Sequence, residues 1–163
     1  MNTLKSLILS AVCCIGLNSF GMDQFSVEEE LSKDLKTSRG TKAKVADLKD
    51  KAVLLYFTAS WCPPCQKFTP KVVQFLKENK DSVEVVVVSR DRSKKAATGY
   101  LKSKKANDFY MVLPGKKSDE LSKDFGVEGI PMVVVLNKDG KVVTSNGRSA
   151  ITKSTDLPSD WVK

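Results

Sequence analysis

Hydrophobic residues along the chain alternate between continuous runs and helical repeats. The runs at 53–58 and 83–88 are apolar almost throughout, and the second is rich in β-branched side chains, which predicts strands buried on both faces. Between them, apolar positions recur at helical spacing over 63–80 and predict an amphipathic helix. A second helical repeat follows over 94–104. The order strand, helix, strand, helix is typical of an α/β domain.

Shorter patterns flank this centre. Asn137-Lys138-Asp139-Gly140 lies between two apolar runs and predicts the turn of a β-hairpin. No element is assigned to the tail over 151–163. The other expected elements are a helix over 27–35 that ends at 38–40, a strand and turn over 42–51, an extended segment over 110–113, a helix over 118–125 stopped by Gly126, and hairpin strands over 132–136 and 141–144. This pattern predicts a three-layer α/β/α fold around a central mixed sheet that ends in the hairpin.

Two cysteines, Cys62 and Cys65, lie where the first buried strand passes into the first long helix. A Cys-x-x-Cys pair at such a junction is typical of a thiol–disulfide redox site. Cys62 would stand at the helix N-terminus, where the positive end of the helix dipole favours a thiolate. Cys65, one turn later, would be close enough to form a disulfide and to resolve a mixed disulfide. We therefore expect Cys62 to be the exposed, reactive thiol and Cys65 the recessed one.

The only other cysteines, Cys13 and Cys14, fall in a segment with the features of a secretory signal peptide. A positively charged start and an apolar core precede small residues at a cleavage site between Gly21 and Met22. The core is short for a membrane span, and an uncleaved anchor is the alternative. The expected organisation is a signal peptide over 1–21 and export to a periplasmic or extracellular location.

A single domain over 22–163 follows from the length of the chain, because the residues left after cleavage suffice for one ordinary core. The polar segment 22–40 is expected to be an N-terminal extension of this domain. After cleavage the only cysteines left are those of the Cys-x-x-Cys pair, so no structural disulfide is expected elsewhere.

The chain carries a net charge of +8, and much of the excess lies in the basic stretch 90–105. Such a stretch suits nucleic acid or an anionic membrane surface. No nucleic-acid-binding module is recognisable, so we expect no nucleic-acid partner and a membrane contact only through a membrane-bound electron donor. The simplest interpretation of the stretch is a solvated helix face, and its field is expected to favour acidic protein partners.

Histidine is absent from the chain, which excludes Cys-His and Ser-His catalysis and histidine-based metal sites. A structural zinc site needs four ligands, and the expected mature chain offers two cysteines. The sequence therefore predicts no metal and no cofactor other than a redox-active disulfide between Cys62 and Cys65. A dedicated peroxidase is disfavoured, because two prolines between the cysteines fit disulfide exchange better.

The stretch Ala59-Ser60-Trp61-Cys62-Pro63-Pro64-Cys65, with Pro70 downstream, resembles the thioredoxin superfamily. The longer run 56–70 is similar to the tryparedoxin and nucleoredoxin branch, as are 86–93, 126–131 and the pair at 147–148. The resemblance extends from about Leu31 to Trp161. It implies a thioredoxin fold and disulfide exchange with protein substrates.

The same resemblance implies roles for individual residues. Cys62 would be the nucleophile and Cys65 the resolving thiol. Ile130 and Pro131 would form a loop facing the cysteines, with a cis peptide bond whose backbone pairs with an extended substrate. Trp61 would shield the disulfide and line the substrate groove.

Tyr56 marks a departure from many thioredoxins, which carry a buried acid at this position. The proton of the resolving thiol must then go to water or to another group. Tyr56 itself is a weak candidate, because an unperturbed phenol titrates near about 10. Glu84 and Asp91 are further candidates on the basis of strand order alone.

Pro63 and Pro64 have no N–H, so the sulfur of Cys62 loses two possible backbone donors. Its thiolate should be less stabilised than in the strongest oxidants. We therefore expect a monomeric thiol–disulfide oxidoreductase that works in the reducing direction with a thiol electron donor. The alternative is a non-catalytic thioredoxin-fold binding or assembly protein, which turnover in an insulin-reduction assay would exclude.

Overall fold

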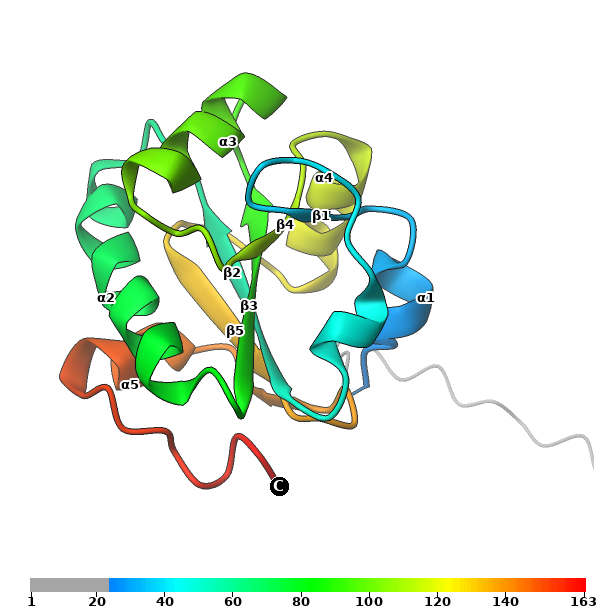
Figure 1. Ribbon diagram of the computed structural model, residues 1–163, viewed down its shortest axis with the longest axis vertical. Helices are drawn as coiled ribbons and strands as arrows, with labels where there is room; N and C mark the ends of the chain where they lie inside the picture. Colours follow the sequence, from blue (N-terminus) through cyan, green and yellow to red (C-terminus); the bar gives the residue numbers. More distant parts are fainter. Residues whose placement is uncertain (1–23) are drawn as a thin grey trace, which may run out of the picture.

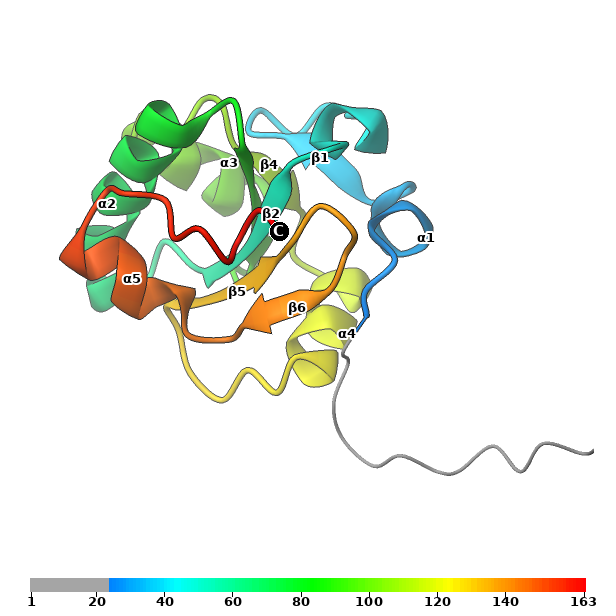
Figure 2. The same ribbon diagram turned by 90° about the horizontal axis from the view of Figure 1, so that it is seen from below.

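The computed structural model describes residues 24–163, which form a six-stranded mixed sheet between two layers of helices (Figure 1, Figure 2). The strands lie in the order β1-β4-β3-β2-β5-β6. Their bounds are β1 (Leu35–Thr37), β2 (Ala52–Thr58), β3 (Val83–Ser89), β4 (Tyr110–Val112), β5 (Met132–Leu136) and β6 (Val142–Thr144). β4, β3 and β2 pair in parallel, whereas β1, β5 and β6 join by antiparallel pairing. The predicted three-layer α/β/α fold with a closing hairpin is confirmed.

Helices cover both faces of the sheet. One layer holds α2 (Pro63–Asn79), α3 (Lys94–Ser103) and α5 (Gly147–Lys153). The other holds α1 (Val27–Leu31), the 3-10 helix η1 (Val45–Leu48) and α4 (Lys116–Asp124). Because side chains alternate along a strand, β2, β3, β4 and β5 each contribute to both layers of the core.

The central strand β2 explains why the site lies where it does. All seven of its residues are buried, as the continuous apolar run predicts. It pairs with β3 from Ala52 opposite Val83 to Thr58 opposite Ser89. The carboxyl ends of the two strands therefore lie side by side, and the loops that leave them meet at one end of the sheet.

Helix α5 approaches the sheet through a glycine. A Cβ atom on Gly147 would lie 2.7 Å from the Val135 side chain and 2.9 Å from that of Val133. Only glycine lets the helix begin this close to β5. The neighbouring Arg148 places its guanidinium 5.9 Å from the ring centroid of Phe68 and so ties α5 to α2.

Segment 24–40 differs from its prediction. The expected helix over 27–35 ends at Leu31, and Leu35 starts the edge strand β1, which pairs with β4 at Val112. Phe25, Leu31 and Leu35 are fully buried, so the segment is part of the core and not an appended extension. The strand exists because a distant partner is available, which local pattern does not reveal.

Of the strand and turn predicted over 42–51, the strand is wrong, whereas a turn is present at 49–50. Lys42 makes only an isolated bridge with Lys36, and Val45–Leu48 form η1, which buries Leu48 against the sheet. The start of α5 was not predicted either. The predicted signal peptide and its cleavage site between Gly21 and Met22 lie outside the described residues. In the described part, no helix combines the length and the hydrophobicity needed to cross a membrane.

Candidate active site

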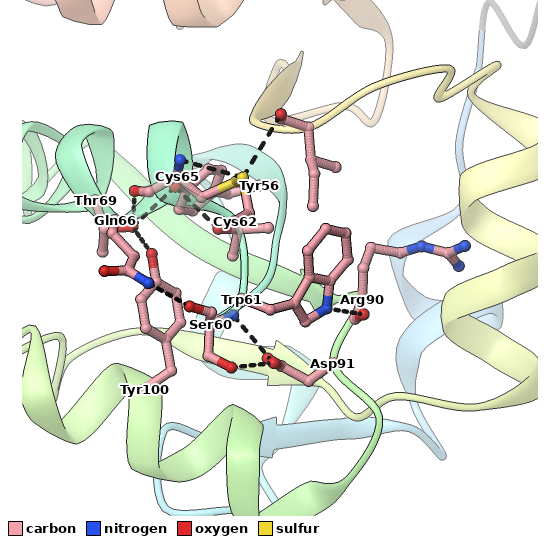
Figure 3. Close-up of a disulfide and its surroundings, with 12 residues drawn as sticks. Tyr56, Ser60, Trp61, Cys62, Cys65, Gln66, Thr69, Arg90, Asp91 and Tyr100 are labelled. Atoms are coloured by element: carbon pink, nitrogen blue, oxygen red, sulfur yellow. Dashed lines mark hydrogen bonds between the residues drawn. A yellow bond between two sulfur atoms is a disulfide. The ribbon is translucent and has the colours of Figure 1, made fainter.

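Cys62 and Cys65 form a disulfide at the N-terminus of α2 (Figure 3). The sulfurs are 2.07 Å apart and the Cα atoms 5.2 Å apart. Cys62 caps the helix with an extended backbone, and Pro63 and Pro64 fill the first helical positions. Proline is favourable there, because its missing N–H has no intrahelical partner in any case. The predicted disulfide at the strand-to-helix junction is thus present.

The sulfur of Cys62 receives one backbone hydrogen bond from the first turn of α2. The N–H of Cys65 donates to Cys62 Sγ at 3.2 Å. Pro63 and Pro64 contribute no donor, as expected from the sequence. A thiolate at Cys62 would therefore be stabilised by this N–H and by the helix dipole.

Exposure separates the two cysteines less than predicted. Cys62 retains 3% of its surface and Cys65 none, so the predicted order holds, but neither is freely exposed in the disulfide. Ile130 packs against the small cluster that Ala59, Cys62 and Cys65 form. The carbonyl oxygen of Ile130 lies 3.7 Å from Cys62 Sγ.

The loop that carries Ile130 and Pro131 faces the disulfide. The Ile130-Pro131 peptide bond is cis, which confirms the prediction. β5 begins directly afterwards and pairs antiparallel with β2, with Met132 opposite Phe57. This register brings the loop to the end of β2, next to Cys62.

Trp61 lies at the surface next to Cys62, and its shielding of the disulfide stays a prediction. Its side chain is 58% exposed, and its indole N–H donates to the carbonyl of Arg90 at 3.1 Å. The ring is thereby fixed to the loop after β3 (Figure 3). It adds exposed apolar surface beside Cys62, of the kind that marks contact sites for partners.

Asp91 holds the loop that leads into the cysteine pair. One carboxylate oxygen accepts the backbone N–H of Ser60 at 3.0 Å and its hydroxyl at 2.6 Å. The other accepts the hydroxyl of Ser89 at 3.1 Å. The side-chain amide of Gln66 donates to the carbonyl of Ser60 at 2.6 Å and closes the loop from the α2 side. Asp91 therefore positions the active-site loop, and none of these bonds goes to a cysteine.

Glu84 is excluded as a proton acceptor for Cys65. It lies in β3 opposite Val53, near the start of both strands, whereas the cysteines follow the end of β2. Its carboxylate pairs with Lys51. Burial raises the pKa of Glu84 despite this partner. Strand order placed the residue on the correct strand but could not tell which end of it faces the site.

A buried network of hydroxyl groups lies beneath Cys65 (Figure 3). Thr58 donates to the hydroxyl of Tyr56 at 3.1 Å, and Thr69 donates to the carbonyl of Cys65 at 2.9 Å. The hydroxyl of Thr69 also lies 2.9 Å from that of Tyr56 and 2.6 Å from that of Tyr100. Because Thr69 has one proton, which goes to Cys65, both tyrosines must donate to Thr69.

Comparison with known proteins agrees with this geometry. A family model described as thioredoxin-like matches residues 50–142. Tryparedoxin of Trypanosoma brucei brucei is 32% identical over 125 residues, which cover 73% of this chain and 84% of the relative. This chain belongs to the thioredoxin-like family. Probable nucleoredoxin 1 of Arabidopsis thaliana is 36% identical over 117 residues, but the match spans only 20% of that longer relative.

Solved structures show the same fold for this thioredoxin-like protein. Thioredoxin from Wuchereria bancrofti superimposes with a TM-score of 0.67 at 41% identity, over 74% of this chain and 86% of that one. Native tryparedoxin I from Crithidia fasciculata gives a TM-score of 0.70 at 31% identity, over 84% and 98%. The chain therefore has the thioredoxin fold and a Cys-x-x-Cys pair of a redox protein family.

Tyr56 does not replace a buried acid in this thioredoxin-like protein. Burial raises the pKa of Tyr56 far above its ordinary value. The phenol keeps its proton at neutral pH and acts as a donor to Thr69. Its contribution is positional: through Thr69 it helps to hold the carbonyl of Cys65 in the first turn of α2.

Sequence reasoning missed Thr69 and Tyr100 as parts of the site. Thr69 follows Cys65 by four positions, a spacing at which a helical threonine commonly bonds the earlier carbonyl, so a signal existed. Tyr100 comes from α3, for which the sequence predicted only a helix over 94–104. In residues 24–163, no three His, Cys, Asp or Glu side chains come together as metal ligands would.

Proposed function

We propose that this thioredoxin-like protein is a thiol–disulfide oxidoreductase that reduces disulfides in protein substrates. The observation that carries the proposal is the position of Cys62. It caps α2, receives the N–H of Cys65 on its sulfur and faces the cis Ile130-Pro131 loop. This arrangement combines a stabilised nucleophile, a resolving thiol within reach and a backbone edge for a substrate.

The reaction proceeds through two exchanges. The thiolate of Cys62 attacks one sulfur of the substrate disulfide; that bond breaks, and the other substrate sulfur leaves and takes up a proton. Cys65 then loses its proton and attacks Cys62, which forms the Cys62–Cys65 disulfide and releases the second substrate thiol. In total two electrons pass to the substrate, and its two sulfur atoms each take up a proton from solvent. Solvent also accepts the proton of Cys65, since Tyr56 stays protonated and Asp91 and Glu84 bond elsewhere.

Substrate docking uses the surface next to Cys62. An extended peptide beside Ile130 gains main-chain hydrogen bonds without a sequence requirement. The exposed ring of Trp61 supplies apolar contact. Pro63 and Pro64 support the reducing direction, because they leave the Cys62 thiolate with fewer backbone donors than an unsubstituted first turn would provide.

A thiol donor returns the oxidised protein to its dithiol form, and the working unit is a monomer. Export is part of the proposal through the signal-like segment 1–21. Intact-mass measurement of the exported protein is expected to give a chain that begins at Met22, with two thiols after reduction. A mass that includes residues 1–21 would contradict cleavage.

Insulin reduction in the presence of dithiothreitol tests the activity. The wild-type protein is expected to accelerate precipitation of the insulin B chain, and Cys62→Ser to abolish the acceleration. Failure of the fully reduced wild-type protein to turn over would favour the non-catalytic binding alternative.

Equilibration of the Cys62–Cys65 couple with glutathione tests the direction. We expect a potential nearer to thioredoxin, at about −270 mV, than to the oxidant DsbA, at about −120 mV. A potential close to about −120 mV would contradict the reducing direction, but it would not contradict disulfide exchange itself.

A further inference from the structure

One exposed face of α3 and its flanks is uniformly basic. Residues 92–105 contain no acidic side chain, and their cations account for most of the net charge of +8. Five of the cations are exposed, and Lys104 is half-buried. We call the following six residues the basic ridge: Arg92, Lys94, Lys95, Lys102, Lys104 and Lys105. Within residues 24–163, no ridge residue is in an ion pair.

The basic ridge begins beside the active site. Trp61 and Ser60 are held by Arg90 and Asp91, and Arg92 follows directly. On the buried face of α3, the hydroxyl of Tyr100 lies 2.6 Å from that of Thr69 in α2, so α3 contacts the helix that carries the cysteines (Figure 3). The start of the basic ridge at Arg92 therefore lies next to the active-site loop, and the rest of the ridge extends along the exposed side of α3.

The dimensions of the ridge suit a protein partner. The ten residues of α3 span about 15 Å. A standard protein interface buries about 800 Å² on each partner, which is a patch roughly 28 Å across and therefore wider than α3 is long. A protein whose disulfide reaches Cys62 would therefore also cover or closely approach part of the ridge.

We propose that the basic ridge is a docking surface for acidic proteins, whose reducible disulfide is flanked by aspartate and glutamate side chains. This inference rests on the proposed disulfide exchange and names the class of partner that reaches Cys62. The unpaired cations attract carboxylates over about one Debye length, which is about 10 Å at 0.1 M salt. Complementary fields of this kind raise association rates by roughly 10- to 1,000-fold at low salt.

Three synthetic peptides with the same disulfide loop test the proposal. Their flanks carry glutamates, glutamines or lysines, and the measurement is the second-order rate constant for reduction by the reduced protein. The ridge variant combines Arg92→Glu, Lys95→Glu and Lys102→Glu, all at exposed positions whose side chains make no hydrogen bond within residues 24–163. Its thermal unfolding is compared with wild type to confirm that it folds.

A matched control places the same charge change at the other end of the sheet. It combines Lys49→Glu, Lys138→Glu and Lys141→Glu, which are exposed before the start of β2 and in the β5–β6 turn. Because Val53 pairs with Leu136, these positions gather at the end opposite Cys62. The control separates an effect of the ridge from an effect of net charge.

The wild-type protein is expected to reduce the glutamate peptide at least about tenfold faster than the lysine peptide at low salt. The ridge variant loses or reverses this preference, whereas the control keeps most of it, and 0.5 M salt reduces the preference to about threefold or less. Equal wild-type rates for the three peptides, or an equal loss in both variants, would overturn the proposal. So would ridge-dependent binding to phosphatidylserine vesicles without any peptide preference.

Two further readouts separate this proposal from the proposed function. Reduction of the uncharged disulfide of 2-hydroxyethanethiol is expected at equal rates in all three proteins, and its absence would contradict disulfide exchange itself. Binding of labelled peptides to the Cys62→Ser variant, followed by fluorescence anisotropy, requires no exchange. Preferential binding of the glutamate peptide there supports docking on the ridge, and equal binding of the three peptides contradicts it.

Discussion

Tyr56 and Phe57 are neighbours on β2, both fully buried, and they face opposite sides of the sheet. Phe57 lies in a mainly apolar cluster, with its ring 6.2 Å from that of Phe125. Tyr56 packs edge-on against Phe68 at 5.7 Å, and its hydroxyl belongs to the network beneath Cys65. The same strand therefore supports an apolar layer on one side and a layer with directional polar contacts on the other.

The two sides of β2 contribute differently: one side mainly supplies stability, and the other also fixes the geometry of the site. Apolar burial is non-directional and is satisfied by many rotations of a helix on a sheet. Hydrogen bonds in a buried network are directional and favour one arrangement. The hydrogen bonds of Thr69 thus fix the position of α2 relative to β2 and α3. They also fix the position of the Cys65 carbonyl.

Removal of Phe57 is expected to have the largest effect on stability. Phe57→Ala leaves a cavity in the apolar layer and should lower the free energy of unfolding by about 3–5 kcal/mol, measured by denaturant unfolding. The rate of disulfide exchange by the folded protein should change less than twofold, because Phe57 itself is not part of the cluster around the cysteines. A large loss of exchange in fully folded Phe57→Ala would contradict the division between the two layers.

Thr69→Val should have the next largest effect and should act on the site as well. The variant keeps the shape of the side chain but leaves two tyrosine hydroxyls and the Cys65 carbonyl without their partner, at a cost of about 1–3 kcal/mol in unfolding free energy. We also expect a changed rate for the resolving attack by Cys65 in rapid-mixing experiments.

Thr152→Val is the matched control for Thr69. Thr152 donates to the carbonyl of Arg148, four residues earlier, but at an exposed position of α5. Its replacement should alter stability by no more than about 0.5 kcal/mol and leave exchange unchanged. Equal effects of the two valine variants would show that the buried network carries no special role.

Tyr56→Phe should have a smaller effect at neutral pH, about 0.5–1.5 kcal/mol, because one hydrogen-bonded hydroxyl is lost. Its effect depends on pH. Burial raises the pKa of Tyr56 above its ordinary value of 10.0, so the folded state retains a proton that the unfolded state releases. This contribution is fully present below about pH 10 and is lost as pH rises further, at up to about 1.4 kcal/mol per pH unit.

Unfolding free energies of wild type and Tyr56→Phe between pH 8 and 11 test this sign. The wild-type protein should lose stability more steeply above pH 10, so that the gap between the two proteins closes or reverses. Parallel curves would contradict a buried, protonated Tyr56. Tyr100→Phe removes only one donor to Thr69. Its effect on the free energy of unfolding should therefore be smaller than the effects of Phe57→Ala, Thr69→Val and Tyr56→Phe.

Local sequence patterns predicted the parts of this fold that depend on neighbours in the chain. The buried runs of β2 and β3, the amphipathic α2 and the cysteine pair follow from periodicity and spacing. β1 was missed, because Leu35 becomes a strand residue only through its distant partner Val112. The cis Ile130-Pro131 bond was predicted from family resemblance and not from local pattern.

The site shows the same limit. The prolines after Cys62 were interpreted correctly, since their effect on backbone donors is local. The hydroxyl network was not predicted, because it joins β2 and α2 to Tyr100 of α3, which tertiary packing alone brings together. Asp91 was named as a proton acceptor but positions Ser60, a role that depends on two strands ending side by side.

Trapping of mixed disulfides tests the central claim most directly. Reduced Cys65→Ser protein is mixed with a protein that contains an accessible disulfide, and covalent complexes are resolved by non-reducing electrophoresis and mass spectrometry. We predict that Cys65→Ser accumulates a complex linked through Cys62, and that Cys62→Ser forms none. Complexes that form through Cys65 in the Cys62→Ser variant, at a rate equal to that of Cys65→Ser, would contradict the assignment of Cys62 as the attacking thiol.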